Sequence, residues 1–142
     1  MGFDVSSMLD MLSRLGMAVL LGGLVGVERR VHGRWADLRT YISVSLAAAI
    51  FVIVGEYALP GEHPDVSRII QGIATGVGFL GAGTILKLSD QVEIKGITTA
   101  SSIWLAAALG TASGLRLYPL AIVGAVFSLV LLLVLRPVEK RL

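Results

Sequence analysis

Residues 69–86 form a run of eighteen residues without a charged side chain, and this run constrains the fold more than any other feature of the chain. Roughly 20 apolar residues in a helix suffice to cross the hydrocarbon core of a bilayer. Residues 76–81 read Gly-Val-Gly-Phe-Leu-Gly, the glycine spacing of a dinucleotide-binding loop. Such a loop needs a strand before it and an amphipathic helix after it, whereas this one lies inside an apolar run. The pattern therefore predicts a membrane helix rather than a nucleotide site.

The composition of the whole chain agrees with a membrane protein. Apolar residues make up 55% of the 142 residues and charged residues only 15%, and the mean hydropathy is +0.83. Soluble domains carry about 25% charged residues. Cysteine is absent, which excludes disulfides, thiolate metal sites and cysteine nucleophiles. Because the charges cluster between apolar runs, the basic balance indicates loops at a membrane surface, and no nucleic-acid partner is predicted.

Five apolar segments predict a single transmembrane domain that spans residues 1–142, with no soluble domain. We expect an all-α integral membrane protein, a bundle of five transmembrane helices. The helices are predicted at about residues 8–27, 41–57, 69–86, 97–113 and 118–135. A bundle of four, with the first segment lying in the interface, is the alternative. The first helix is predicted to begin after a cap-like Ser7, and Asp10 lies four residues before Arg14, a spacing that allows an ion pair.

The distribution of lysine and arginine predicts the orientation of the bundle. With five crossings, nine of the twelve basic residues fall on one side, in segments 28–40 and 87–96 and after residue 135. The other side holds Arg14, Arg68 and Arg116. Cytoplasmic loops carry the excess of positive charge. We therefore predict an N-terminus outside and a C-terminus in the cytoplasm.

Small residues recur four apart in three of the segments, and such spacing places them on one face of a helix. In a bilayer these faces allow two helices to approach closely. The glycines predicted to pack against other helices are Gly22, Gly26, Gly72, Gly76, Gly78, Gly81, Gly83, Gly110 and Gly114. The alternative for the third segment is a weak or unwound point, since each glycine costs a helix about 1 kcal/mol relative to alanine.

Polar residues gather at the predicted cytoplasmic ends of the segments. A carboxylate at a membrane boundary needs a partner, so an ion pair of Glu28 with Arg29 or Arg39 is the favoured interpretation. A polar mouth that binds an ion or a partner is the alternative. Hydroxyls open the fourth segment, and Arg68 begins the third on the outer side. The predicted functional polar cluster consists of Glu28, Arg29, Arg39, Thr40, Arg68, Lys95, Thr98 and Thr99.

The sequence predicts no enzyme, no cofactor and no metal site. It contains neither a serine nucleophile elbow nor a P-loop lysine after a glycine-rich turn. Glu28 and His32 lie four apart, but two candidate ligands are a weak metal signal. The two acids and the histidine of residues 61–65 are better explained by a solvated turn, because proline and glycine lie among them.

Four blocks in order resemble the MgtC/SapB family of bacterial membrane proteins. They are G-x-E-R, A-x-L-R-T, R-I-x-x-G-I-x-x-G-x-G-F-L-G-A-G-x-I and K-G-I-T-T-A-S-S-I-W, and the resemblance covers about residues 15–114. The matching positions are Gly26, Glu28, Arg29, Leu38, Arg39, Thr40, Arg68, Gly72, Gly78, Gly81, Gly83, Gly96, Thr98 and Thr99. The resemblance implies a small inner-membrane protein linked to growth in low magnesium and to survival inside macrophages. It also implies modulation of other membrane proteins, including F-type ATP synthase and transporters.

Two departures from the family pattern are visible. Asp37 stands where the second block is expected to have glycine, and the chain ends at Leu142, where the virulence-factor branch continues into a soluble domain. We expect a non-enzymatic membrane regulator that forms a homo-oligomer, with a dimer favoured. Its expected partners are the lipid bilayer and other inner-membrane proteins. A small oligomeric channel or transporter for magnesium or another ion is the alternative.

Overall fold

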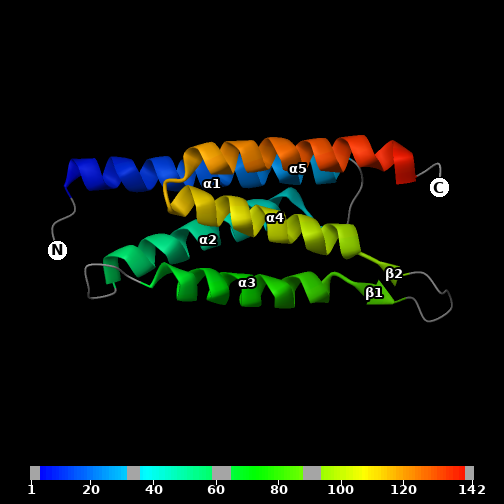
Figure 1. Cartoon of the computed structure of the whole chain (residues 1–142), viewed down its shortest axis with the longest axis horizontal. Helices are drawn as coiled ribbons and strands as arrows, with labels where there is room; N and C mark the ends of the chain where they lie inside the picture. Colours follow the sequence, from blue (N-terminus) through cyan, green and yellow to red (C-terminus); the bar gives the residue numbers. More distant parts are fainter. Residues whose placement is uncertain (1–3, 32–35, 59–64, 88–93, 140–142) are drawn as a thin grey trace.

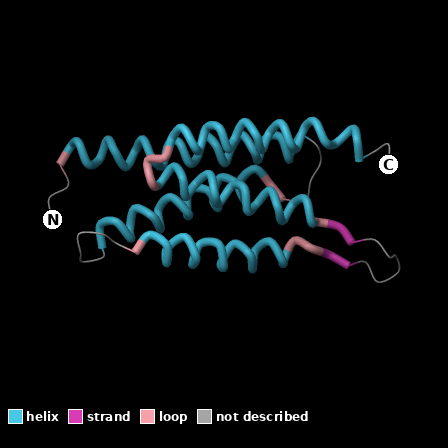
Figure 2. The backbone as a smooth tube through the Cα atoms, viewed as in Figure 1, coloured by secondary structure: helices cyan, strands magenta, loops and turns pink. Residues whose placement is uncertain are grey.

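A computed structural model describes residues 4–31, 36–58, 65–87 and 94–139 (Figure 1). Within them the helices are α1 (Val5–Val31), α2 (Leu38–Ala58), α3 (Val66–Gly83), α4 (Ile97–Gly114) and α5 (Tyr118–Glu139). Two strands of two residues each, β1 (Leu86–Lys87) and β2 (Ile94–Lys95), pair antiparallel between α3 and α4. Helix dominates the backbone (Figure 2). The predicted all-α class with five helices is therefore confirmed.

Successive helices run in opposite directions along the bundle (Figure 1). One end of the bundle holds the C-terminus of α1, the N-termini of α2 and α4, the β1–β2 pair and the C-terminus of α5; we call it the hairpin end. The opposite end holds the N-terminus of α1, the C-terminus of α2, the N-terminus of α3 and the short α4–α5 connection. We call it the turn end. The segments predicted to face the cytoplasm thus meet at the hairpin end. Which end faces the cytoplasm stays a prediction.

Three helices are long and apolar enough to cross a membrane among the described residues: α1, α2 and the 118–135 part of α5. α3 and α4 contain 18 residues each, about 27 Å of helix at 1.5 Å per residue. A bilayer core is about 30 Å thick. The chain is therefore a helical membrane protein, and the number of crossings beyond three stays a prediction.

The start of α1 differs from the prediction, which placed the cap at Ser7. The helix begins at Val5, and the Asp4 carboxylate accepts a hydrogen bond from the backbone N–H of Ser7 at 2.9 Å. The hydroxyls of Ser6 and Ser7 donate to the same oxygen of Asp4. A carboxylate that accepts from the third helical N–H is a strong N-cap, and it extends the helix by three residues beyond the predicted start at residue 8.

α2 packs closely against α1 and α4 because glycines on these two helices let their backbones approach it. A Cβ atom added at Gly22 of α1 would lie 2.6 Å from the Cβ of Ser45. One added at Gly110 of α4 would lie 2.0 Å from the Ser45 carbonyl oxygen. Gly26 and Gly114 make similar approaches to α2, at 2.8 and 2.9 Å. The buried Ser45 hydroxyl donates to the carbonyl of Ala18, which ties α2 to α1 at this level.

The glycines of α3 behave differently. α3 is one continuous helix, so no break is seen where the glycine-rich run predicted a weak point as one alternative. A Cβ added at Gly81 would lie 3.5 Å from that of Ala100, an ordinary contact. At the remaining four positions an added Cβ meets nothing within 4 Å, so these residues make no close helix contact with the described parts of the chain. They are Gly72, Gly76, Gly78 and Gly83.

Candidate functional site

Five polar side chains lie buried together near the hairpin end, where α1, α2 and α4 meet. We call them the hairpin-end cluster: Glu28, Arg29, Tyr41, Thr99 and Ser102. A guanidinium nitrogen of Arg29 lies 3.9 Å from a carboxylate oxygen of Glu28, and both side chains are at most 5% exposed. Tyr41 and Ser102 are fully buried. The ion pair favoured by the sequence is therefore present as Glu28–Arg29.

Several donors of the hairpin-end cluster have no aligned acceptor in the described part of the chain. Nε and Nη2 of Arg29 and the hydroxyl of Tyr41 are buried without a hydrogen-bond partner among the described residues. The Tyr41 hydroxyl nevertheless lies beside Arg29 and Ser102. A buried donor without an acceptor costs about 1–3 kcal/mol.

The hydroxyls that open α4 are mostly engaged within the helix. Ser101 donates to the carbonyl of Ile97 at 2.9 Å, and Ser102 donates to that of Thr98 at 2.6 Å. Such bonds to the preceding turn are the structural role that hydroxyls commonly play in helices. Gly96, at the N-cap, has a φ of +99°, and a Cβ there would lie 1.9 Å from the Thr84 carbonyl oxygen. Glycine is therefore required where β2 turns into α4.

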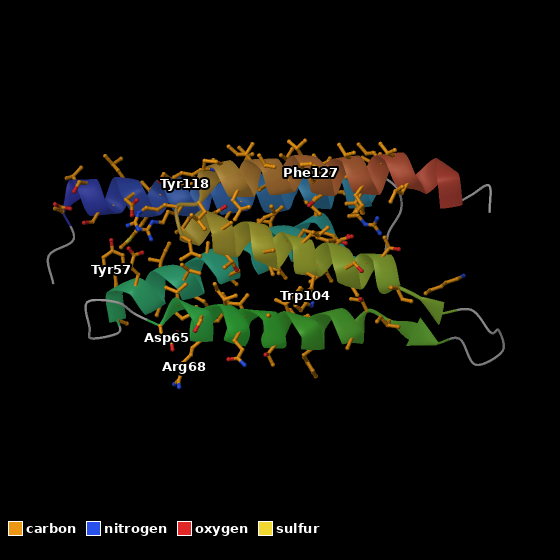
Figure 3. All side chains as sticks on the ribbon, in the orientation of Figure 1. Tyr57, Asp65, Arg68, Trp104, Tyr118 and Phe127 are labelled. Atoms are coloured by element: carbon orange, nitrogen blue, oxygen red, sulfur yellow. The ribbon has the colours of Figure 1, made fainter. Side chains whose placement is uncertain are left out.

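The remaining members of the predicted cluster lie outside the buried group. Arg39, Lys95 and Thr98 are exposed at the hairpin end, and Thr40 is partly buried there. Arg68 lies at the turn end, 84% exposed, with its Nε 3.3 Å from the Asp65 carboxylate (Figure 3). Of that set, Glu28 and Arg29 are in contact, and Thr99 is buried at the same end of the bundle. The fully buried Tyr41 and Ser102 were not members of the predicted cluster.

A second polar cluster, at the turn end, joins four charged side chains from three parts of the chain. Arg14 of α1 is completely buried and forms ion pairs with Asp10 and with Glu56 of α2. It also donates to the carbonyl of Gly114 at 3.1 Å. Arg116, in the α4–α5 connection, binds both oxygens of Asp10 at 2.8 Å and one of Glu56 at 2.7 Å. We call Asp10, Arg14, Glu56 and Arg116 the turn-end cluster.

The sequence pointed to only part of the turn-end cluster. The spacing of Asp10 and Arg14 predicted their ion pair, which is confirmed, and Arg14 faces the bundle interior. The pairing of Glu56 with Arg116, 60 residues away in the chain, was not predicted. The available signal was position, since Glu56 and Arg116 lie near the ends of predicted segments on the same side as Arg14.

Two apolar grooves lie along α3. The groove between α2 and α3 has a volume of about 800 Å³, and among its lining residues only Arg68 is charged. The groove between α3 and α4 is smaller, about 270 Å³, and Trp104 of α4 lines it (Figure 3). Neither groove is lined by Glu28, Arg29 or Thr99. The polar clusters and the grooves are therefore separate features.

The described residues contain no group of three or more histidine, aspartate or glutamate side chains that could hold a metal ion. The weak candidate pair of Glu28 with His32 and the loop around Glu62 and His63 involve residues outside the described ranges. Asp65, at the end of that loop, is described. Its carboxylate accepts a hydrogen bond from Ser67, which holds the pKa of Asp65 below its ordinary value of 3.8.

Comparison with known proteins gives one family and several relatives. Residues 15–141 match the model of the MgtC family. The chain is 39% identical over 139 residues to an Escherichia coli K12 protein called "Putative magnesium transporter YhiD", covering 94% of this chain and 64% of the relative. It is 40% identical to protein SrpB of Synechococcus elongatus (84% and 71%) and 39% identical to protein MgtC of Brucella abortus (89% and 51%). No solved structure matches the chain.

The fold and the two buried charge clusters define a small helical membrane protein with a glycine-packed core. The match to the family model covers most of this chain, and the relatives named above are about 40% identical to it. The chain belongs to the MgtC family. It spans between half and about two thirds of the length of the Escherichia coli and Brucella relatives.

Proposed function

We propose that this chain is a non-enzymatic regulatory protein of the bacterial inner membrane that acts by contact with other membrane proteins. The observation that carries the proposal is the composition of one face of α3. Beyond the first turn of α3, the exposed or partly buried residues on the side away from the bundle are Gln71, Thr75, Gly78, Phe79 and Ala82. With 3.6 residues per turn they span an arc of roughly 100°. We call them the outer face of α3.

Apart from Phe79, the outer face of α3 carries small and polar side chains, which suit contact with another helix. Small and polar side chains mark helix–helix contacts in membranes, because they permit close backbone approach and hydrogen bonds between helices. Thr75 bonds only to the Gln71 carbonyl of its own helix among the described residues. By contrast, α5 exposes leucine, valine, isoleucine and phenylalanine along its length, and such side chains are compatible with lipid. The contrast favours α3 as the contact helix.

The hairpin-end cluster supports the same proposal. It holds a buried ion pair, and donors for which residues 4–31, 36–58, 65–87 and 94–139 provide no acceptor, at the end that the basic residues predict to be cytoplasmic. A regulator that is modulated from the cytoplasm would use this end. Within the proposal, the N-terminus lies outside, the chain forms homo-oligomers, and its partners include ATP synthase and transporters. Growth in low magnesium and intracellular survival are the processes it would affect.

Ion transport is the second candidate, and the name of the Escherichia coli relative, which refers to magnesium transport, favours it. Reconstitution separates the two. Purified protein in liposomes filled with a magnesium-sensitive dye is expected to pass no more Mg²⁺ than empty liposomes do. A robust flux that Glu28→Ala or Arg39→Ala abolishes would establish transport and overturn the regulatory proposal.

A further inference from the structure

The groove between α2 and α3 has the shape of a site for one phospholipid. Its volume is about 800 Å³, and apart from Arg68 and Ser43 it is lined by aliphatic side chains, phenylalanine, alanine and glycine. Arg68 lies at one end, in the first turn of α3, and Leu80 lines the groove twelve residues further on. Twelve residues of helix span about 18 Å.

That length matches one leaflet of a bilayer, whose hydrocarbon is about 15 Å deep, half of the roughly 30 Å core. An acyl chain lying in the groove would therefore begin at Arg68 and end near the middle of the membrane. The turn end, where Arg68 lies, also holds the ends of α2 and α4, so it marks the edge of the bundle. Depth, apolar lining and position thus agree with a lipid tail.

Arg68 supplies the charge that complements a headgroup. Its side chain is 84% exposed, and Asp65 contacts it at Nε, 3.3 Å away (Figure 3). A guanidinium carries five N–H donors in a planar fork, so one carboxylate leaves donors for a second oxyanion. The fork fits phosphate geometry better than an ammonium does. Arg68 therefore has donors left for the phosphodiester of a lipid.

Two glycines keep the groove open. Gly72 and Gly76 line it, and a Cβ added at either meets nothing within 4 Å. Larger side chains at these positions would occupy the groove without disturbing the fold. We propose that the α2–α3 groove binds one anionic phospholipid, with an acyl chain along Gly72 and Gly76 and the phosphate at Arg68. This site is distinct from the outer face of α3 and from both polar clusters.

Native mass spectrometry of the whole chain tests the proposal. The protein is released from nanodiscs that contain phosphatidylglycerol and phosphatidylethanolamine in equal amounts, and the lipid that stays bound is identified. The wild type is expected to retain one phosphatidylglycerol, with a preference of at least fivefold over phosphatidylethanolamine. Gly76→Leu is expected to lose most of the bound lipid. Arg68→Gln is expected to reduce the preference to near one.

Gly16→Leu is the control. Position 16, in α1, also has open space around it, but Gly16 lines neither groove and lies outside the outer face of α3. This variant is expected to retain the lipid as the wild type does, and circular dichroism checks that all variants stay helical. Equal lipid retention in the wild type and Gly76→Leu would overturn the proposal. So would a wild-type dimer that Gly76→Leu converts to a monomer, since a second copy would then occupy the groove.

Discussion

Arg14 of α1 and Glu56 of α2 form an ion pair at the turn end, and the arginine side chain is completely buried. Charges at this depth are stable only when they are paired and hydrogen-bonded. Asp10, the Gly114 carbonyl and Arg116 complete the set of partners around the pair. The pair therefore joins α1 and α2 to the α4–α5 connection.

Replacing Arg14 with glutamine should destabilise the protein strongly. It removes the bonds of the buried guanidinium to Asp10, Glu56 and the Gly114 carbonyl, and a hydrogen bond to a charged group contributes about 1.5–3 kcal/mol. The measurement is the free energy of unfolding in detergent micelles. Arg68→Gln is the control, because the Arg68–Asp65 pair is exposed and contributes little. Equal stability of the two variants would show that the buried pair does not hold the helices together.

A methyl group at Gly110 should destabilise the bundle, whereas one at Gly16 should not. The new Cβ at position 110 would lie 2.0 Å from the backbone oxygen of Ser45, which cannot move alone. Overpacking of this kind costs about 1–3 kcal/mol. At Gly16 nothing lies within 4 Å, so alanine should be neutral or add up to about 1 kcal/mol through helix propensity. Thermal unfolding of Gly110→Ala and Gly16→Ala compares them, and a stable Gly110→Ala variant would contradict the close packing.

The backbone conformation at Arg116 predicts that replacement by glycine and replacement by alanine differ in their effect on stability. Arg116 has a φ of +60°, a left-handed conformation that glycine adopts freely and other residues adopt at a cost of about 1–2 kcal/mol. Arg116→Gly and Arg116→Ala lose the same contacts to Asp10 and Glu56. Arg116→Gly should therefore be the more stable of the two by about 1 kcal/mol in denaturant unfolding. If the alanine variant is as stable, the turn does not require this conformation.

The stability of the N-terminal cap of α1 should depend on pH. Hydrogen bonds from the side chain and then the backbone of Ser7 hold the pKa of Asp4 below its ordinary value of 3.8. A carboxyl whose pKa is lowered by folding stabilises the helix start fully above that ordinary value, and this contribution is lost as the pH falls through the lowered pKa. Hydrogen exchange at Ser7 is the readout. Protection should fall below about pH 3.8 in the wild type, and Asp4→Asn, which cannot titrate, should show no such fall.

The helices, and the glycine contacts that α1 and α4 make with α2, could be predicted from the sequence. Uncharged runs of helical length define the segments, and small residues four apart share a face whatever packs on it. Gly22 and Gly110 accordingly lie against Ser45. The same spacing at Gly72 and Gly76 predicted packing equally well, yet these two face open space. Which neighbour covers a small face depends on how the helices are placed, and local spacing does not contain that information.

The buried charge pairs were likewise predictable only where the paired residues lie close together in the sequence. Glu28–Arg29 was predictable because the two residues are adjacent and lie where a charge needs a partner. Arg14 and Glu56 lie 42 residues apart in the chain, and Tyr41 belongs to α2 whereas Glu28 and Arg29 belong to α1. Pairings of this kind follow from the packing of α2 between α1 and α4. They become visible only once that packing is known.

Site-specific photocrosslinking in native membranes tests most directly whether the protein acts by contact through α3. A photoreactive phenylalanine analogue replaces Phe79 of α3 or, as the matched control, Phe127 of α5, which are 82% and 71% exposed (Phe127 in Figure 3). We expect position 79 to form adducts with a membrane protein other than this chain, and position 127 to form none. The account is contradicted if neither position yields such an adduct, or if both yield the same ones.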